Sequence, residues 1–318
     1  MTEIDIAFPC YNIAPWLDGM MESILAQRGP EWRIVARDDG SSDATVERLK
    51  AWQSRLGDRM VILDNPSREN LGIAGCYTAV LRATSAPWVL TADPDDVWLP
   101  GHLERVVNAL RAIESSAGSA MPVAVCTDAE VIDEHQIPIA PSFWRWARSS
   151  PRRVRHILEV AMENPALGST MAVNRALLDI ALPIPRESGG QDWWFALAAT
   201  AFGQLHAIEE VSILYRRHRG NHSNGPLGRS IFEACRLSMA EPKAVRHRVQ
   251  QLLFNKIAPQ AAVFEARYGS RLSARDAAGL RAISTLRARG PISRRVSVIR
   301  YGLSFASMVK SFGMWVLC

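Results

Sequence analysis

The stretch that decides the fold is Asp93-Pro94-Asp95-Asp96-Val97-Trp98, which directly follows the apolar run Trp88-Val89-Leu90-Thr91-Ala92. Three aspartates within four residues repel one another, and no basic residue lies nearby in the sequence to offset them. A bound Mg²⁺ or Mn²⁺ would offset the repulsion, because both cations prefer oxygen ligands. The alternative is a polar loop in which Asp95 or Asp96 caps a helix that begins near Pro100. This stretch alone leaves both interpretations open.

Short apolar runs alternate with helical patterns on both sides of the aspartates. Strands are predicted at residues 4–8, 33–36, 60–63, 88–92, 123–126, 168–173 and 211–215. Helices are predicted at about 14–27, 43–56, 73–83, 101–115, 151–163 and 191–202, with a helical pattern from about 227 onward. The alternation weakens after residue 140. The first half therefore predicts right-handed βαβ units and an α/β fold with a mostly parallel sheet.

Polar clusters follow the predicted strands at the point where each strand ends. They are Pro9–Asn12, Asp38–Asp43, Asn65–Gly72 and Asp93–Asp96. Ligands of open α/β sheets bind outside the carboxyl ends of the strands. Four polar segments at one sheet edge therefore favour a binding site over four unrelated loops.

Composition and cysteine usage point to an intracellular globular protein. Of 318 residues, 48% are hydrophobic and 22% are charged, which is ordinary for a soluble protein. The five cysteines form no CxxC pair, which favours a reducing cytoplasm over a disulfide framework or a zinc site. Thr2, Glu3 and Asp5 occupy positions where a signal peptide carries basic and apolar residues, so we expect a cytoplasmic protein.

Charge is distributed unevenly along the chain. Residues 227–318 carry 16 lysines and arginines against 4 acidic residues, a net charge of +12. The rest carries 21 against 28, a net charge of −7. This asymmetry predicts two regions, residues 1–226 and a helical region at 227–318, and an anionic partner for the second. Nucleic acid and an anionic membrane surface are the two candidates.

The C-terminal stretch 296–317 is apolar with Arg300 and Lys310 embedded in it. These charges interrupt it too much for a membrane span, which needs about 20 predominantly apolar residues. It could form an amphipathic helix in the membrane interface or a helix docked on the protein's own core. The aromatic residues gather at the apolar end and are not interleaved with the basic ones, which favours a membrane over nucleic acid.

The order and spacing of four motifs resemble family 2 glycosyltransferases of the GT-A fold. The motifs are Ala7-Phe8-Pro9-Cys10-Tyr11-Asn12, Asp38–Thr45, Glu69-Asn70-Leu71-Gly72 and Asp93–Trp98. Further stretches are similar to bacterial rhamnosyltransferases of cell-surface polysaccharide synthesis, namely Gly168–Asn174, Gln191–Trp194 and Tyr215–Asn221. The resemblance covers residues 3–224 and implies a Rossmann-like, nucleotide-binding GT-A sheet. The sequence departs from the pattern at Gly75-Cys76-Tyr77, where many such enzymes carry Asn or Arg-Asn, so donor contacts from this helix stay open.

The resemblance implies a nucleotide-sugar site and a metal of DXD type. The nucleotide-sugar residues would be Pro9, Tyr11, Asn12, Asp38, Asp39, Asn70, Gly72, Asp93 and Arg216. Asp39, or less readily Asp38, would accept a hydrogen bond from a pyrimidine imide, because a carboxylate is acceptor-only. Asp95 and His218 would hold Mg²⁺ or Mn²⁺ at the diphosphate. For His218 and Arg216 the alternative is a solvated basic loop.

Asp192 is the catalytic base that the resemblance implies. Inverting transfer needs one carboxylate to take the proton of the acceptor hydroxyl. The alternative for Asp192 is an N-cap followed by two core tryptophans. The acceptor and sugar pocket would then be formed by Asp96, Trp98, Gly168, Met171, Trp193 and Trp194.

Two rival enzyme classes lack their motifs in this sequence. A nucleotidyltransferase would carry a Gly-rich phosphate loop with a lysine, and residues 8–14 contain neither Gly nor Lys. A dinucleotide-dependent oxidoreductase would carry GxGxxG after the first strand. The resemblance to rhamnosyltransferases implies an enzyme that transfers L-rhamnose from dTDP-β-L-rhamnose. The basic C-terminal region predicts that this enzyme is peripheral, at the inner face of the plasma membrane. The acceptor would be a lipid-linked or surface glycan of lipopolysaccharide or O-antigen synthesis. A UDP- or GDP-sugar donor is the alternative, and nucleic acid is not an expected partner.

Overall fold

The computed structural model describes residues 2–149, 151–154, 156–218, 220–221 and 250–303, so the boundary predicted at residue 226 lies outside the described residues. The chain divides into two compact units. The first comprises Met1–Phe143, Ala166–Arg186 and Gly190–Gly220. The second comprises Trp144–Pro165, Glu187–Gly189 and Asn221–Cys318. A segment in the middle of the chain therefore belongs with the C-terminal helices.

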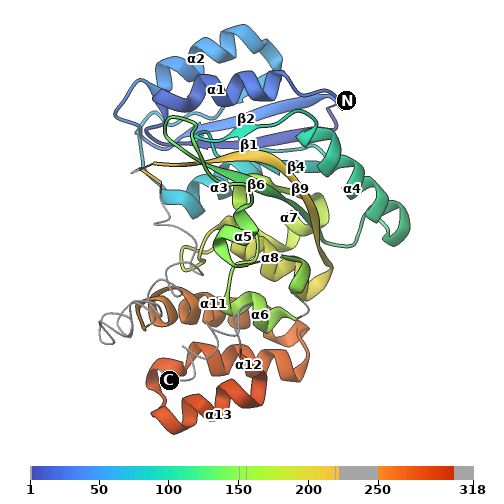
Figure 1. Cartoon of the computed structure of the whole chain (residues 1–318), viewed down its shortest axis with the longest axis vertical. Helices are drawn as coiled ribbons and strands as arrows, with labels where there is room; N and C mark the ends of the chain where they lie inside the picture. The colour runs from blue at the N-terminus through green and yellow to red at the C-terminus, as the bar shows by residue number, and fades with distance from the viewer. Residues whose placement is uncertain (1, 150, 155, 219, 222–249, 304–318) are drawn as a thin grey trace. The chain divides into compact units, whose positions relative to one another are not determined.

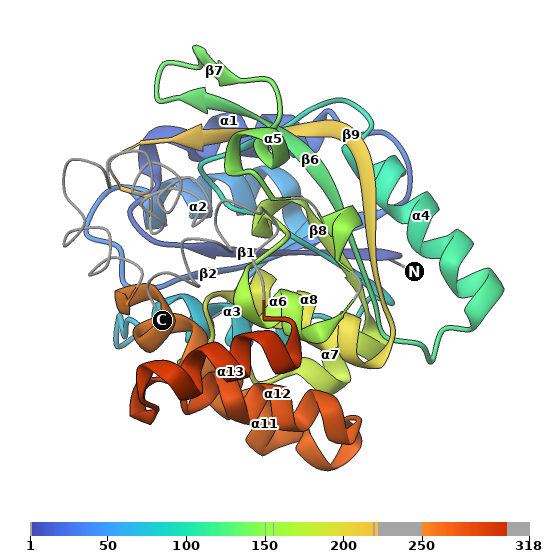
Figure 2. The same ribbon diagram turned by 60° about the horizontal axis from the view of Figure 1, so that its bottom comes forward.

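A nine-stranded sheet organises the first unit (Figure 1). Its strands are β1 (Ile4–Cys10), β2 (Trp32–Asp38), β3 (Met60–Ile62), β4 (Trp88–Thr91), β5 (Val97–Trp98), β6 (Val123–Asp133), β7 (Pro138–Ala140), β8 (Met171–Asn174) and β9 (Gln204–Arg217). They run in the order β3-β2-β1-β4-β8-β6-β9-β5, and β7 pairs with β6 in a hairpin visible in Figure 2. β3, β2, β1 and β4 are parallel, as the alternating pattern predicts. β8 is antiparallel to both β4 and β6, and it comes after residue 140, where that pattern weakens.

Helices cover both sides of the parallel strands. They are α1 (Ala14–Leu25), α2 (Thr45–Leu56), α3 (Gly72–Arg82), α4 (His102–Ala117), α7 (Arg175–Ala181) and α8 (Gln191–Phe202). α1 and α2 lie on one side of β1 and β2, whereas α3, α7 and α8 lie on the other (Figures 1 and 2). Two-sided coverage explains why Ile6 and Ala7 of β1, whose side chains point to opposite faces of the sheet, are both fully buried. α8 is apolar on all sides because it runs through the core.

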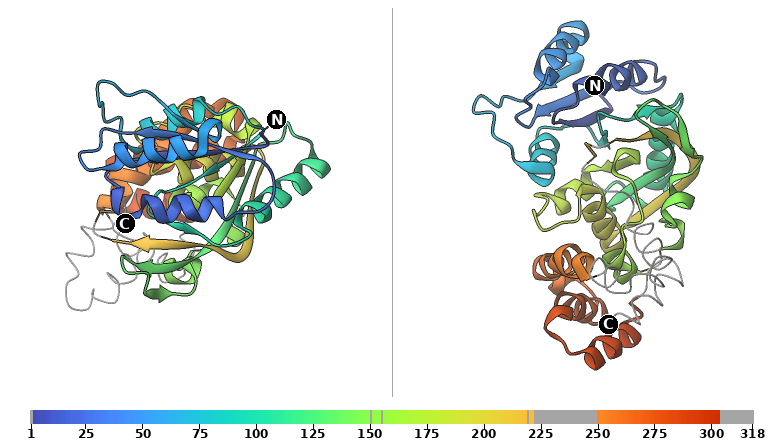
Figure 3. Two further views of the ribbon diagram at one scale, coloured as in Figure 1. Left: turned by 90° about the horizontal axis from the view of Figure 1, so that it is seen from above. Right: turned by 60° about the vertical axis from the view of Figure 1, so that its left-hand side comes forward.

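The second unit is helical. Its helices are α6 (Ile157–Met162), α11 (Ala258–Tyr268), α12 (Ala274–Ser284) and α13 (Pro291–Tyr301), and α5 (Phe143–Ala147) spans the sequence boundary between the units. α11, α12 and α13, drawn in orange to red, follow one another in Figure 3. A Cβ added at Gly279 would lie 2.5 Å from Leu158 of α6, so this glycine lets α12 approach α6 closely. Within the described residues, no helix is both long enough and apolar enough to cross a bilayer.

Several predicted elements differ from the observed ones in detail. The helix predicted at 151–163 is a 3₁₀ turn at Pro151–Arg153 and the short α6. The predicted strand 168–173 begins with a 3₁₀ turn, η3 (Gly168–Thr170), before β8. The helical predictions for 227–249 and 304–317 lie outside the described residues.

Candidate functional site at the carboxyl ends of the parallel strands

The loops after β1 and β2 are joined by direct hydrogen bonds. The backbone N–H of Asp39 donates to the carbonyl of Cys10 at 2.8 Å. The Asn12 amide oxygen accepts from the Ser42 N–H at 2.8 Å, and the Asn12 N–H donates to Ser41 Oγ at 2.9 Å. Asn12 has φ 53°, a left-handed conformation that asparagine tolerates. Asn12 therefore shapes the loop, while the neighbouring Tyr11 is 53% exposed and Pro9 is partly exposed at the same edge.

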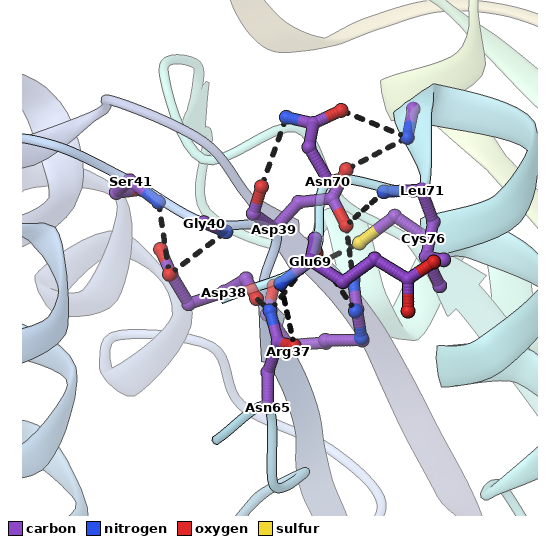
Figure 4. A network of polar contacts seen from close by, with 11 residues as sticks. Arg37, Asp38, Asp39, Gly40, Ser41, Asn65, Glu69, Asn70, Leu71 and Cys76 are labelled. Carbon is purple, nitrogen blue, oxygen red and sulfur yellow. Dashed lines mark hydrogen bonds and ion pairs between the residues drawn. The ribbon is translucent and has the colours of Figure 1, made fainter. Parts of the chain in front are cut away.

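Asp39 is fully engaged within the protein (Figure 4). Its Oδ1 accepts hydrogen bonds from the Arg37 guanidinium and from the Leu71 N–H, the latter at 3.0 Å. Its Oδ2 accepts from the Gly72 N–H at 2.9 Å, at the start of α3. The Asn70 side chain donates to the Asp39 carbonyl and accepts from the Gly72 N–H. The predicted residues Asn70 and Gly72 thus fix the position of Asp39.

One carboxylate oxygen of Asp38 has no hydrogen-bond partner among the described residues. Its Oδ2 accepts from the N–H groups of Gly40 and Ser41 at 3.1 and 3.0 Å (Figure 4). Its Oδ1 is buried and has no hydrogen-bond partner among the described residues. A buried acceptor of this kind is costly unless it meets a donor. Of the two adjacent aspartates, Asp38 is therefore the one with a free acceptor atom.

The aspartate-rich turn follows β4, next to β1 in the sheet. The Tyr77 hydroxyl of α3 donates to Oδ1 of Asp93 at 2.7 Å. Burial, reinforced by the Asp95 and Asp192 carboxylates, raises the pKa of Asp93 to about 7, and the Tyr77 hydrogen bond opposes this rise. Burial and the neighbouring Asp95 and Asp93 also hold the pKa of Asp96 well above its usual range. Both shifts favour the protonated carboxyl over the carboxylate at Asp93 and Asp96.

Asp96 and Arg216 fix the conformation of the aspartate-rich turn through buried hydrogen bonds. Asp96 is fully buried, and its Oδ1 accepts from the Arg216 N–H at 2.9 Å. The Arg216 guanidinium donates to the carbonyls of Asp95 at 2.8 Å and Glu134 at 3.4 Å. Arg216 is only 4% exposed. These contacts position the turn, and they are contacts within the protein, whereas the sequence predicts that Arg216 binds the nucleotide sugar.

Asp95 and His218 meet, as predicted for a metal site. His218 Nε2 lies 2.8 Å from Asp95 Oδ2, and the Trp16 ring lies 3.9 Å from the imidazole between centroids. No group of three or more His, Cys, Asp or Glu side chains suited to a metal occurs in the described part of the chain. Mg²⁺ in phosphate sites is commonly held by one or two carboxylates together with substrate phosphates and water. The Asp95 carboxylate, with Asp93 nearby at the same edge of the sheet, is an oxygen donor set that fits such an ion.

Asp192 begins α8 and faces the aspartate turn. Its carboxylate raises the pKa of both Asp93 and Tyr77, as expected for neighbouring negative charge. Gly168 of η3 packs against the start of α8, since a Cβ there would lie 2.5 Å from Gln191 Nε2 and 3.5 Å from Asp192 Cβ. Gly168 is itself held by Thr91, whose hydroxyl donates to the Gly168 carbonyl at 2.5 Å. The structure therefore places Asp192 and Asp93 at one edge of the sheet.

The predicted sugar-pocket residues include several core side chains. Trp193 and Trp194 are 1% and 0% exposed, and the Trp194 indole donates to the Ala181 carbonyl at 2.8 Å. Trp98 and Met171 are 2% and 1% exposed. These four side chains pack inside the unit as core residues and are not part of the proposed pocket. Tyr77 is the residue that sequence reasoning missed, although the unusual Gly75-Cys76-Tyr77 marked its helix as different.

Comparison with known proteins shows a family to which the sequence is similar. Residues 5–176 match the profile described as "Glycosyl transferase family 2". An uncharacterized glycosyltransferase of Nostoc sp. is 26% identical over 229 residues, which is 69% of this chain and 66% of that protein. The chain matches four other curated relatives over 27% to 40% of their length.

Solved structures share the fold at low sequence identity. S. aureus TarS 1-349 in complex with UDP-GlcNAc has a TM-score of 0.56 at 14% identity, covering 99% of this chain and 90% of that one. The mannosyltransferase PcManGT from Pyrobaculum calidifontis in complex with GDP-Man and Mn²⁺ has a TM-score of 0.52 at 19% identity, covering 99% and 86%. These neighbours confirm the GT-A-like α/β fold class. The family profile matches more than half of the residues of this chain, and the chain therefore belongs to glycosyl transferase family 2.

Proposed function

We propose that the chain is a metal-dependent, inverting glycosyltransferase that uses a nucleoside-diphosphate sugar. The observation that carries the proposal is the gathering of Asp38, Asp93, Asp95 and Asp192 at the carboxyl ends of the parallel strands. Ligands of open α/β sheets bind at this edge. Residues 1–226 would form the catalytic region, and the helices of 227–318 would hold the enzyme at the inner face of the plasma membrane.

Each polar group would have a separate task in donor binding. The free Oδ1 of Asp38 would accept a hydrogen bond from the imide of a pyrimidine base, while Asp39 keeps the loop and α3 in place. Tyr11, Pro9 and Asn12 would lie under the nucleotide, and Asp93 would face the ribose. Asp95, held by His218, would bind Mg²⁺ or Mn²⁺ together with the diphosphate. When bound, the cation would stabilise negative charge on the leaving nucleoside diphosphate.

Asp192 would act as the general base of an inverting reaction. It would accept the proton of the acceptor hydroxyl while that oxygen forms a bond to the anomeric carbon. The bond from this carbon to the diphosphate oxygen breaks on the opposite face. Gly168 supports the role, because its missing side chain lets η3 pack against the start of α8. Asp96 and Arg216 would keep the aspartate turn in the geometry that binding requires.

The donor and acceptor rest on resemblance alone. The similarity to rhamnosyltransferases favours dTDP-β-L-rhamnose and a lipid-linked or surface glycan acceptor in lipopolysaccharide or O-antigen synthesis. The structural neighbours carry UDP-GlcNAc and GDP-Man, which keeps UDP- and GDP-sugars as the alternative.

Calorimetric titration of the purified protein tests the proposal. dTDP, UDP and GDP are each titrated with and without Mn²⁺, into wild type, Asp95→Asn and Asp58→Asn. Asp58 is an exposed aspartate between α2 and β3 and serves as the matched control. We expect dTDP to bind only with Mn²⁺, and this binding to be lost in Asp95→Asn alone. Tight binding of UDP or GDP would assign a UDP- or GDP-sugar as the donor in place of a dTDP-sugar. A folded protein that binds none of the three nucleotides would contradict a nucleotide-sugar site.

A further inference from the structure

The less exposed side of helix α13 carries the polar residues Arg294 and Ser297 together with the half-buried Val298 and Tyr301. Arg294 Nε donates to the Leu286 carbonyl at 2.8 Å, and its NH2 group donates to the Arg287 carbonyl at 3.2 Å. Ser297 is 3% exposed and accepts a hydrogen bond from Arg289 at 3.1 Å. Surface helices of globular proteins ordinarily turn their apolar side inward and their polar side to water. α13 departs from this pattern, because three of its four aliphatic side chains, Ile292, Val296 and Ile299, are exposed.

The outward side of α13 is aliphatic. Ile292, Val296 and Ile299 are 78%, 54% and 72% exposed. At about 100° per residue these three side chains lie within an arc of about 60° on the helix. On the same projection Arg295 and Arg300, both exposed, lie on opposite flanks of this arc. We call Ile292, Val296 and Ile299, with these two arginines, the outer face of α13.

The charge around the outer face is strongly positive. Residues 250–303 carry ten lysines and arginines against two acidic residues, Glu265 and Asp276. An aliphatic stripe between cationic flanks matches the boundary between lipid headgroups and acyl chains. Beyond α13, residues 304–318 continue with one lysine and no acidic residue. A second copy of the chain would bring its own arginines against these, so charge complementarity favours an anionic lipid surface as the occupant.

We propose that the outer face of α13 is a membrane-docking surface that inserts Ile292, Val296 and Ile299 between the headgroups of anionic lipids. Arg295 and Arg300 contact the phosphates on either side. This proposal names the residues that make the peripheral membrane contact proposed above, and it rests on that proposed location. Docking requires neither donor nor turnover, so its failure would leave the transferase proposal standing.

Cosedimentation of the full chain with vesicles tests the proposal. Vesicles of phosphatidylcholine alone are compared with vesicles that also contain phosphatidylglycerol. The apolar variant combines Ile292→Gln, Val296→Gln and Ile299→Gln. Its matched control combines Ile137→Gln and Ile139→Gln, two aliphatic side chains of the β6–β7 hairpin that are 60% and 47% exposed. Because all these side chains point outward, far-UV circular dichroism should be unchanged in every variant.

We expect wild type to bind phosphatidylglycerol vesicles and the apolar variant to bind them about tenfold more weakly, with the control unchanged. The combined variant Arg295→Glu and Arg300→Glu should lose a similar factor. Its control is Lys50→Glu with Arg82→Glu on the first unit.

Several results would overturn the proposal. They are equal binding to neutral vesicles, an unaffected apolar variant, and a dimer in light scattering that the apolar variant abolishes. Loss of binding on deletion of 304–318, with the apolar variant unaffected, would assign the contact to that segment instead.

Discussion

His218 Nε2 lies 2.8 Å from Oδ2 of Asp95, and Nδ1 of the same ring accepts a hydrogen bond from the Gly220 N–H at 3.1 Å. A ring nitrogen that accepts a hydrogen bond carries no proton. The proton of the neutral imidazole, assigned from this network, is therefore on Nε2, where it is donated to Asp95. His218 in this state orients the carboxylate, and Nε2 must give up that proton before it can bind a metal.

Substitution of His218 separates these two roles. We expect His218→Ala to weaken Mn²⁺ binding in the presence of dTDP by about 10–100-fold, the usual effect of removing a group that orients a metal ligand. His218→Gln should retain most of the affinity, because its amide N–H can still donate to Asp95. Mn²⁺ titration followed by electron paramagnetic resonance measures both. If His218→Gln binds Mn²⁺ as weakly as His218→Ala, while the exposed control His135→Gln binds it normally, the imidazole itself is a metal ligand.

Asp38 and Asp39 should respond differently to the same change. Asp39→Asn leaves the buried Arg37 guanidinium without its charge partner, and we expect a loss of about 3–5 kcal/mol in the free energy of unfolding. In Asp38→Asn the side-chain oxygen can still accept hydrogen bonds from the N–H groups of Gly40 and Ser41. The new NH₂ group, a donor, would then face the imide N–H of the base, which is also a donor. This variant should lose nucleotide affinity at nearly unchanged stability. Urea unfolding and calorimetry measure the two effects, and the reverse pattern would assign the base contact to Asp39.

Asp192→Asn tests the general base. Removing a positioned base typically costs about 10²–10⁴ in rate. We expect kcat to fall by this factor while the Kd of the nucleoside diphosphate stays within twofold, because the carboxylate contacts the acceptor side. Asp179→Asn, an exposed aspartate on α7, is the control. A change in nucleotide affinity as large as the change in kcat would instead make Asp192 a binding residue.

Gly168→Ala should act through Asp192. The new Cβ would lie 2.5 Å from Gln191 Nε2, so the buried Gln191 side chain, next to Asp192 at the start of α8, must move. Overpacking of this kind typically costs about 1–3 kcal/mol of stability. We expect kcat to fall at least tenfold, since small misplacements of reacting groups are costly. Gly290→Ala, where an added Cβ meets nothing within 4 Å, is the control and should have wild-type kcat. Unchanged kcat in Gly168→Ala would show that Asp192 tolerates the shift.

Local pattern predicted the parallel half of the fold because its causes are local. β1, β2 and β4 are short, largely apolar runs buried on both faces, and β1 and β2 are each followed directly by an amphipathic helix. Hydrophobic periodicity reports this arrangement directly. The antiparallel pairing of β8 with β4 and β6 depends on contacts between residues about 80 and 50 positions apart, as in Val89 with Val173. No local pattern encodes such a pairing.

The site was predictable in its location but less so in the roles of its residues. Polar clusters at strand ends located Asp38, Asp93 and Asp95, since parallel strands end at one edge. Sequence alone does not reveal which polar side chains are already hydrogen-bonded to other groups of the protein. Asp39 is held by Arg37 and the start of α3, and Arg216 by backbone carbonyls. Tyr77 was missed because its partner Asp93 comes from a neighbouring strand.

His102 gives the protein a pH-dependent stability outside the proposed site. It is fully buried against Trp98, with Nδ1 2.8 Å from Ser212 Oγ, and its Nε2 has no hydrogen-bond partner among the described residues. Burial, with a smaller contribution from Arg105, lowers the pKa of His102 from 6.5 to about 3. Between these two values the unfolded chain takes up a proton that the folded chain does not. Stability is therefore complete above pH 6.5 and falls as the pH decreases toward 3.

His102→Gln removes this titration. Each pH unit below 6.5 should cost wild type roughly 1.4 kcal/mol, so at pH 5.0 it should lose about 2 kcal/mol relative to the variant, compared with pH 7.5. Urea unfolding at the two pH values measures the difference, with the exposed His135→Gln as control. Parallel behaviour of wild type and His102→Gln would mean that the buried imidazole becomes charged without unfolding. In that case Ser212 and its neighbour Thr127, 2.6 Å away, would have to rearrange to stabilise the cation.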